Sequence, residues 1–309
     1  MSELGEASRR AAAFLLGSQD ADGGWRDFNL YKGIATSWTT AHVATALAAA
    51  VGLDDRIPAA SEAAAGFLSR HREASGGWAY NARCMADADS TALALIFLTG
   101  RVPRPNLKDV AVLASFQRAD GGFATYRHLP ATHPWGASHA EVTPTALRAL
   151  APFLAEDHAI LRSGRDWLAR HAGRDEAVYW WTTPEYLRLE MARLGAPMAR
   201  GSADIPCGEV FSTALAIERS ILAGGPKHVV AVRYLLERQC ADGSWPSTPI
   251  LLVPDPNARP GSAAARTGHG YADQNRTFTT ATVLSALNVA RSSRGAAGSS
   301  ARTKLELQS

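Results

Sequence analysis

A two-part unit that returns five times along the chain constrains its fold more than any other feature. The first part is a turn that ends in glycine and an aromatic residue; its copies are Gln19–Trp25, Arg72–Trp78, Gln117–Phe123, a degenerate one near Arg174–Val178, and Gln239–Trp245. The second part is a box of small residues: Thr39-Thr40-Ala41, Ser90-Thr91-Ala92, Pro144-Thr145-Ala146, Ser212-Thr213-Ala214 and Thr279-Thr280-Ala281. A repeat of this length predicts one supersecondary unit copied through a single architecture.

The segments on the two sides of each turn differ in polarity. Those before the turns carry charged residues on one side and large apolar residues on the other, as surface helices do. Those after the boxes are rich in Ala, Leu and Thr with few charges, as in Thr39–Val51, Ser90–Leu98 and Ser212–Ile221. Alternating exposed and buried helices predict an all-α fold, an α/α toroid of five to six helix pairs. A short helix at Glu185–Leu194 is the candidate for the sixth pair.

Composition sets the class and the compartment. One toroid domain is predicted at residues 1–290, followed by a disordered Ser- and Gly-rich tail at 291–309. Of the 309 residues, 46% are hydrophobic, and three cysteines show no paired or metal-binding spacing. Together with the lack of a long apolar run, this predicts a cytoplasmic protein, with peripheral membrane contact left open. A net charge of +3 without a basic stretch argues against a nucleic-acid partner.

The chain between turn and box lengthens in the later repeats. It spans 13 residues from Trp78 to Thr91 but 35 from Trp245 to Thr280. Long loops in a compact domain usually form lids or binding surfaces. We therefore expect one rim of the toroid to be elaborated by residues 126–138, 182–206 and 246–274. On that rim, Trp135 and Tyr179-Trp180-Trp181 either line the mouth or pack as ordinary core.

Aligning the boxes brings two columns of residues together. Three residues before each box stand Thr36, Asp87, Glu141, Glu209 and Arg276, and two residues further on stand Trp38, Asp89, Thr143, Phe211 and Phe278. Both columns precede inner helices, so their side chains are expected to face one another at the elaborated rim. Carboxylates at helix starts also cap free N–H groups, and this alternative applies to Glu141 and Glu209.

Only the second repeat carries two carboxylates, Asp87 and Asp89. Two carboxylates close together cannot both ionise cheaply, and apolar surroundings raise the pKa further. The product is a neutral acid that can donate a proton. Aromatic faces from Trp38, Phe211 and Phe278 can stabilise a cation across the cavity. This combination suits protonation of an alkene and guidance of a carbocation.

Three further residues have assigned roles. His139, two residues before Glu141, is placed to pair with a carboxylate and tune its protonation near neutral pH. Arg276 either pairs with Glu209 or Asp87 or binds an anionic group of the substrate. His42 lies within a buried helix and is expected to be a core histidine.

The Gln-x3-Gly-x-Trp turns and the Asp-x-Asp-x-Thr-Ala box together resemble the squalene–hopene cyclase superfamily, the class II terpene cyclases with prenyltransferase and squalene-oxidase repeats. The resemblance covers residues 5–290 and implies the toroid. It also implies that the middle Asp of an Asp-x-Asp-Asp motif, which matches Asp89, protonates the terminal alkene or epoxide of an isoprenoid. Asp87 matches the first Asp. Ser90 replaces the third, and Thr145 stands where hopene-type cyclases have a histidine that polarises the acid.

Protein prenyltransferase β-subunits share this toroid and bind zinc on inner helices. The positions in register here are Glu209, Phe211 and Thr279, which cannot form a Zn²⁺ site. We therefore expect no metal and no cofactor, with Mg²⁺ relevant only to a diphosphate substrate.

The sequence thus predicts a class II-type, protonation-initiated cyclase or isomerase of a linear isoprenoid or prenylated natural-product intermediate. The catalytic residues are Asp89, Asp87 and Glu141, and the substrate-binding residues are Trp38, His139, Glu209, Phe211, Arg276 and Phe278. Two alternatives stay open. A toroid enzyme that uses its carboxylates as acid and base on a polar, non-terpenoid substrate predicts a shallow, charged cavity. A non-catalytic interaction module predicts that Asp87 and Asp89 merely cap a helix.

Overall fold

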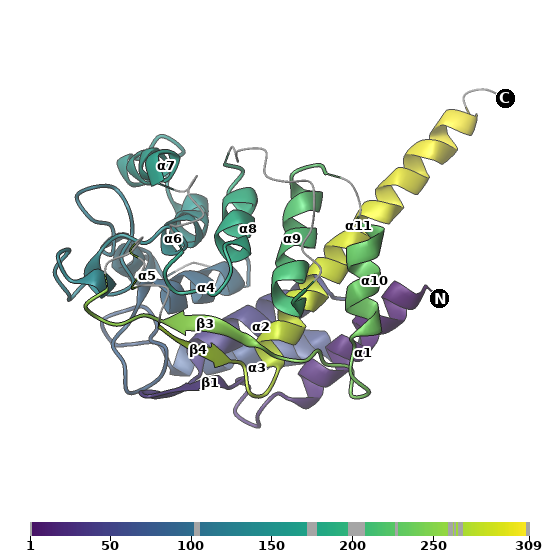
Figure 1. The fold of residues 1–309 in the computed structure, drawn as a ribbon, viewed down its shortest axis with the longest axis horizontal. Coiled ribbons are helices and arrows are strands. Elements are labelled where there is room, and N and C mark those ends of the chain that lie inside the picture. Colours follow the sequence, from purple (N-terminus) through teal and green to yellow (C-terminus); the bar gives the residue numbers. More distant parts are fainter. Residues whose placement is uncertain are drawn as a thin grey trace.

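Six helices form an inner ring in the computed structural model, which describes residues 2–101, 106–171, 178–196, 208–225, 228–258, 262, 264 and 268–306. They are α2 (Ser37–Ala49), α4 (Ala88–Leu98), α6 (Val142–Leu150), α8 (Glu185–Arg193), α9 (Val210–Leu222) and α11 (Thr277–Glu306). Each packs on the next in this order, and α11 returns to α2 to close the ring. The all-α toroid is confirmed, and the segment predicted at Glu185–Leu194 supplies its sixth inner helix (Figure 1).

Five helices of the described chain pack outside this ring. They are α1 (Glu3–Gly17), α3 (Ile57–Arg70), α5 (Leu107–Ala114), α7 (Ala159–His171) and α10 (Val229–Glu237). They contact α11, α2, α4, α6 and α9 respectively. Two short 3-10 turns, η1 (Pro134–Gly136) and η2 (Ala151–Phe153), flank α6. The degenerate turn predicted near 174–178 lies, apart from Val178, outside the described residues.

The repeated turns tie each outer helix to its inner partner. In the first repeat the indole N–H of Trp25 donates to Leu15 O (2.8 Å) in α1, and its backbone N–H donates to Thr40 Oγ1 (2.9 Å) in α2. The glutamine of the turn reaches sideways, since Gln19 Nε2 donates to Ala60 O (2.9 Å) in α3. The last turn does the same to the first helix, because Gln239 Nε2 donates to Ala7 O (2.9 Å). The repeat therefore closes the ring through its own motif.

Two β-hairpins elaborate one rim. Strands β1 (Asp27–Leu30) and β2 (Gly33–Ala35) form the first hairpin, and β3 (Pro249–Val253) and β4 (His269–Ala272) form the second. In Figure 1, β3 and β4 cross the molecule below α8 and α9. Trp181 bridges to Leu251 of β3, so the segment before α8 joins this second hairpin. The predicted rim segment 246–274 contains the second hairpin, whereas the first hairpin was not predicted. Of the predicted segment 182–206, Glu185–Arg193 is the inner helix α8, and residues 197–206 lie outside the described residues.

Helix α8 is charged, and buried salt bridges hold it in the ring. Glu190 accepts from Arg148 of α6 (Nη2 to Oε2, 2.9 Å) and from Arg193 (Nη1 to Oε1, 2.7 Å). Arg193 also donates to Glu218 of α9 (2.6 Å). Burial alone would raise the pKa of Glu190, but the charges of Arg148 and Arg193 outweigh it and lower the pKa to about 2.

Helix α11 continues to Glu306 and projects away from the ring (Figure 1). The disordered tail expected at residues 291–309 stays a prediction, and α11 is assigned through this stretch as far as Glu306. That stretch contains three alanines, which favour helix, and no proline, which would end one. None of the helices described is long and apolar enough to cross a bilayer.

Candidate active site

The third repeat is offset by two residues from the alignment of its sequence box. The backbone N–H of Phe123 donates to Thr143 Oγ1 (2.9 Å), as Trp78 N–H does to Thr91 Oγ1 (3.1 Å). His139 N–H donates to Phe123 O (2.9 Å), matching the bond from Asp87 N–H to Trp78 O (3.0 Å). The box register based on Pro144-Thr145-Ala146 was therefore wrong, because Thr143 and Thr145 both fit the small-residue pattern.

The corrected register changes which residues share a column. His139, not Glu141, is the counterpart of Asp87, and Glu141, not Thr143, is the counterpart of Asp89. The two carboxylates that the repeat places alike, Asp89 and Glu141, stand at the starts of neighbouring inner helices, α4 and α6. Asp89 lies two residues after Asp87, whose carbonyl accepts the N–H of Thr91. Glu141 lies two residues after His139, whose carbonyl accepts the N–H of Thr143.

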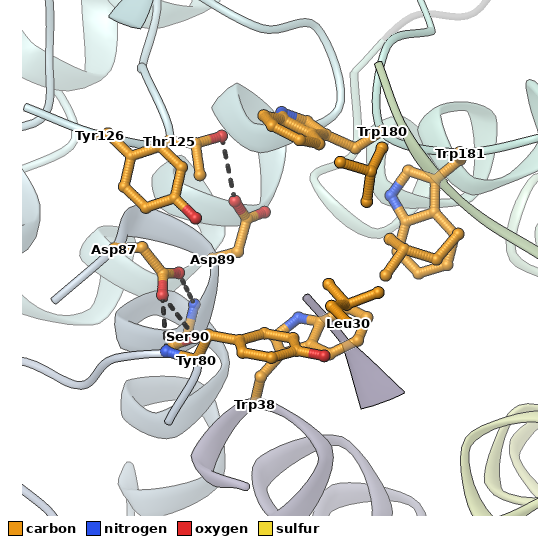
Figure 2. A pocket seen from close by; sticks show the side chains of 12 residues that line it. Leu30, Trp38, Tyr80, Asp87, Asp89, Ser90, Thr125, Tyr126, Trp180 and Trp181 are labelled. Atoms are coloured by element: carbon orange, nitrogen blue, oxygen red, sulfur yellow. Dashed lines mark hydrogen bonds between the residues drawn. The ribbon is translucent and has the colours of Figure 1, made fainter. Parts of the chain in front are cut away.

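A cavity opens between the start of α4, the start of α2 and strands β1 and β3, and Glu141 is not among the residues that line it (Figure 2). Asp87, Asp89 and Ser90 of α4 and Thr125 form its polar side. The remaining lining is aromatic or aliphatic: Trp38, Tyr80, Tyr126, Trp180 and Trp181, with Leu30, Leu251 and Val253 from the hairpin strands. The site is therefore an apolar, aromatic cavity with carboxyl groups at one end.

Asp87 is a helix cap whose two oxygens are both engaged. Oδ1 accepts from the backbone N–H of Ser90 (2.7 Å), and Oδ2 accepts from Ser90 Oγ (2.9 Å) and from the N–H of Tyr80 (2.9 Å). Burial raises the pKa of Asp87 to about 6, against the opposing effect of these hydrogen bonds.

Asp89 has the opposite environment. Its carboxyl borders the cavity (Figure 2), and its one hydrogen bond among the described residues is a long one from Thr125 Oγ1 to Oδ2 (3.4 Å). Burial raises the pKa of Asp89 well above its ordinary value, and the negative charges of Asp87 and Glu141 raise it further. Burial and the two neighbouring charges therefore favour the protonated form of Asp89, whose carboxyl faces the apolar space. Asp89 is not a helix cap, contrary to what an interaction module predicts.

The capping alternative is right for Glu209 and wrong for Glu141. Glu209 accepts from the N–H groups of Phe211 (2.8 Å) and Ser212 (2.6 Å) at the start of α9. Glu141 makes no cap bond to α6. Its Oε1 accepts instead from the N–H groups of Tyr179 (2.7 Å) and Trp180 (2.6 Å). Burial raises the pKa of Glu141 to about 6.

Only one of the three predicted aromatics lines the cavity. Trp38 does so, while Phe278 stacks behind it (ring centroids 4.7 Å apart) and is fully buried. Phe211 stacks in the same way behind Trp181 (5.5 Å). The faces toward the cavity come from Trp38, Trp180 and Trp181, and the two phenylalanines support them.

Tyr80 and Tyr126 also line the cavity and were missed. A signal was present, because each follows a turn aromatic by two or three residues, as Phe28 does in the first repeat. The repeated turns therefore carry cavity residues just beyond their aromatic, besides their structural role.

Two predicted side-chain pairings are wrong. The ring of His139 stacks on Tyr179 (4.8 Å) without contacting a carboxylate, and burial lowers its pKa to about 3, so it stays neutral near pH 7. Arg276 does not pair with Glu209 or Asp87; its guanidinium donates to Asp242 Oδ2 (2.8 Å) on the outer side of the ring. His42 is a core histidine as expected, bonded to Thr282 Oγ1 (3.0 Å) and stacked on Phe278.

At the level of sequence, no family model matches the chain, and no curated protein matches it. Solved structures do resemble it. The apo type II terpene cyclase MstE from Scytonema is 26% identical, with a TM-score of 0.76, over 93% of this chain and 97% of that one. A variant of MstE in complex with geranylgeranyl dihydroxybenzoate, its substrate, is 24% identical with a TM-score of 0.77 over the same shares.

Two other structures extend the comparison. A protein from Actinoplanes is 26% identical, with a TM-score of 0.73 over 93% of this chain and 99% of that one. The GH76A α-1,6-mannanase from Salegentibacter sp. HEL1_6 is 12% identical with a TM-score of 0.55 over the same shares, a likeness of fold alone. The chain therefore has the helical toroid fold of the type II terpene cyclases.

Proposed function

We propose that this protein is a class II-type cyclase of a prenylated small molecule, with Asp89 as the general acid. The observation that carries the proposal is the buried carboxyl of Asp89, whose pKa burial raises and which stands at the end of a cavity whose other walls are aromatic and aliphatic. Such a site suits a substrate that must be protonated on carbon and kept away from water.

Asp89, not Asp87, is the proton donor in this proposal. Both oxygens of Asp87 already accept hydrogen bonds, which orient that carboxyl and favour its charged form. The carboxyl of Asp89 borders the cavity, and within the described part of the chain its one hydrogen bond is the long one from Thr125. The acid is thus available, and Asp87 helps to keep it protonated.

The chemistry balances without a redox partner. The proton of Asp89 adds to the terminal alkene of the prenyl chain, and the alkene electrons form the new C–H bond. The resulting carbocation is attacked by the next alkene, which closes a ring, and loss of a proton restores neutrality. Substrate and product are therefore isomers, and the Asp89 carboxylate regains a proton before the next turnover. The faces of Trp38, Trp180 and Trp181 supply negative charge density along the path of the cation.

A prenylated aromatic is the substrate class we favour. MstE has been captured with geranylgeranyl dihydroxybenzoate, and a variant lacking one aspartate with the product merosterolic acid A. The main rival, a polar-substrate enzyme, expects a shallow charged cavity. The apolar lining and the engagement of Arg276 and Glu209 outside it support the isoprenoid instead. The proposed chemistry needs no cofactor.

The test is a product assay with geranylgeranyl dihydroxybenzoate and with linear isoprenoids, run on wild type, Asp89→Asn and Asp55→Asn. Asparagine keeps the shape of Asp89 without a transferable proton. Asp55 lies exposed in a loop and is the matched control. We expect cyclised product from wild type and Asp55→Asn and none from folded Asp89→Asn. Full activity in Asp89→Asn would remove Asp89 as the acid, and no cyclisation of any substrate by wild type would favour the polar-substrate enzyme.

A further inference from the structure

One buried carboxylate fixes the backbone that carries two walls of the cavity. Glu141, 1% exposed, accepts through Oε1 from two consecutive N–H groups, those of Tyr179 and Trp180. On the other edge of this segment, Leu252 N–H donates to Trp180 O (2.8 Å). Residues 179–181 are thus held between the start of α6 and strand β3.

The segment presents its side chains in two directions. The indoles of Trp180 and Trp181 line the cavity (Figure 2). The ring of Tyr179 instead packs on His139 (4.8 Å), and its hydroxyl donates to Ala258 O (2.8 Å). A shift of the backbone at Glu141 therefore moves both indoles relative to Asp89.

We infer that Glu141 is a positioning residue of the proposed cyclase: its ionised carboxylate sets Trp180 and Trp181 against the path of the cation and places a fixed negative charge near Asp89. The catalytic part of this inference rests on the proposed function. Its structural content, the placement of the indoles and the protonation of Asp89, does not depend on turnover.

The electrostatics agree with this role. Burial raises the pKa of Glu141 to about 6, partly offset by the N–H groups of Trp180 and Tyr179, so the group is mainly ionised above that pH. Its titratable neighbours are Asp89 from α4 and Tyr179 from the 179–181 segment, with His139, neutral, on its own turn. The charge of Glu141 raises the pKa of Asp89.

The second oxygen of Glu141 is the least expected feature of the group. Oε2 is buried and has no hydrogen-bond partner among the described residues. A buried acceptor without a donor destabilises the folded state, because it has lost its hydrogen bonds to water. Unsatisfied groups of this kind call for an explanation, and a functional role is a common one. A carboxylate used only to anchor two N–H groups could be replaced by a neutral amide.

Two conservative variants separate position from charge. Glu141→Gln keeps an oxygen at the reach of Oε1 and removes the charge. Glu141→Asp keeps the charge and withdraws it by one methylene from the N–H groups of Tyr179 and Trp180. Glu156→Gln and Glu156→Asp, in an exposed turn, are the matched controls. Each change is small enough that the ring is expected to fold.

The placement of the indoles is read by ¹⁹F NMR of protein labelled with 5-fluorotryptophan, with signals assigned by Trp180→Phe and Trp181→Phe. We expect Glu141→Asp to shift or broaden both signals and Glu141→Gln to leave them close to wild type. Unchanged signals in Glu141→Asp would overturn the positioning role.

The charge is read from the carboxyl ¹³C signal of Asp89, assigned with Asp89→Asn, in a pH titration. We expect Glu141→Gln to lower the titration midpoint of Asp89 and Glu141→Asp to keep it raised. In activity, Glu141→Gln then loses up to about tenfold in kcat for each pH unit by which that midpoint falls, on the alkaline side and with KM unchanged. An unmoved midpoint in Glu141→Gln would overturn the electrostatic role.

Both NMR results stand even if wild type cyclises nothing, an outcome that counts against the proposed function alone.

Discussion

The carboxyl of Asp87 caps the start of helix α4, whose first turn carries Asp89. Asp87 Oδ1 accepts a hydrogen bond from the backbone N–H of Ser90 (2.7 Å). A carboxylate that orients a helix start thereby orients the acid two residues further on. The same group raises the pKa of that acid by its charge. One residue thus supplies both geometry and electrostatics to the site.

Removing the cap is expected to cost stability. Asp87→Ala removes an N-cap, worth about 0.5–2 kcal/mol. It also leaves the N–H of Tyr80 without its acceptor, which adds about 1–3 kcal/mol. Asp87→Asn keeps an acceptor and should lose less than half as much. Urea unfolding of the three proteins measures the difference, and equal stability of Asp87→Ala and wild type would show that the cap is dispensable.

The pH dependence of turnover should follow Asp89. Because burial raises its pKa well above the ordinary value near 4, activity is expected to persist through the range where a free aspartate is ionised and to fall on an alkaline limb. Asp87→Asn removes a neighbouring negative charge, so the limb should move to lower pH. The profile of kcat/KM reports this, and activity that rises continuously toward alkaline pH would indicate a base instead of an acid.

Aromatic faces should matter for the product more than for folding. Trp38→Phe keeps a π face on the cavity, whereas Trp38→Leu removes it. A desolvated cation–π contact is worth about 2 kcal/mol, or roughly thirtyfold in rate. We expect Trp38→Leu to release partly cyclised products that Trp38→Phe does not, as seen by chromatography and mass spectrometry. Identical product distributions would mean that Trp38 only shapes the cavity.

Two glycines with the same backbone conformation test the role of the repeated turn. Gly23 (φ 88°) and Gly52 (φ 91°) both adopt a left-handed conformation. A Cβ on Gly23 would lie 2.4 Å from Ala63 O of α3, whereas one on Gly52 would meet nothing within 4 Å. Gly52→Ala should cost about 1–2 kcal/mol from conformation alone, and Gly23→Ala about 1–3 kcal/mol more from the clash. Equal losses on chemical unfolding would contradict close packing of the turn on α3.

Stability should also depend on pH through a second buried carboxyl. Asp273 accepts from Thr279 N–H (2.6 Å) at the start of α11, and burial, together with the charge of Asp27, raises its pKa to about 7. A raised carboxyl pKa gives stability that is present below about pH 4 and lost as pH rises through 7. Between about pH 4 and 7 the free energy of unfolding of wild type should fall by up to about 4 kcal/mol for this reason, and Asp273→Asn should abolish that fall. Thermal unfolding from pH 5 to 8 checks this; parallel curves for the two proteins would rule it out.

The repeat made the toroid predictable, because its turns bind the outer and inner helices directly. The register of the third repeat was not predictable, because Thr143 and Thr145 both fit the pattern of the box. The hydrogen bond from Phe123 N–H to Thr143 Oγ1 distinguishes the two threonines. Asp89 and Asp87 were found because a second carboxylate broke the pattern of the repeat. The true partner of Glu141, backbone at residues 179–180, could not be found, because no side-chain pattern encodes a bond to distant N–H groups.

The charged helix α8 marks another limit of sequence reasoning. Its residues look like those of an exposed helix, and the ion pairs of Glu190 with Arg148 of α6 and with Arg193 of its own helix explain how Glu190 can be buried. The hairpin β3–β4 is likewise hard to predict, because its pairing joins strands separated by residues 254–268.

Proton transfer to carbon is the central claim, and an isotope experiment tests it most directly. Wild-type protein is given geranylgeranyl dihydroxybenzoate in D₂O, and the product is analysed by mass spectrometry and NMR. Protonation by Asp89, whose carboxyl exchanges with solvent, predicts a cyclised product with a single non-exchangeable deuterium on the carbon that was the terminal alkene. A cyclised product without deuterium at that carbon would contradict protonation as the first step.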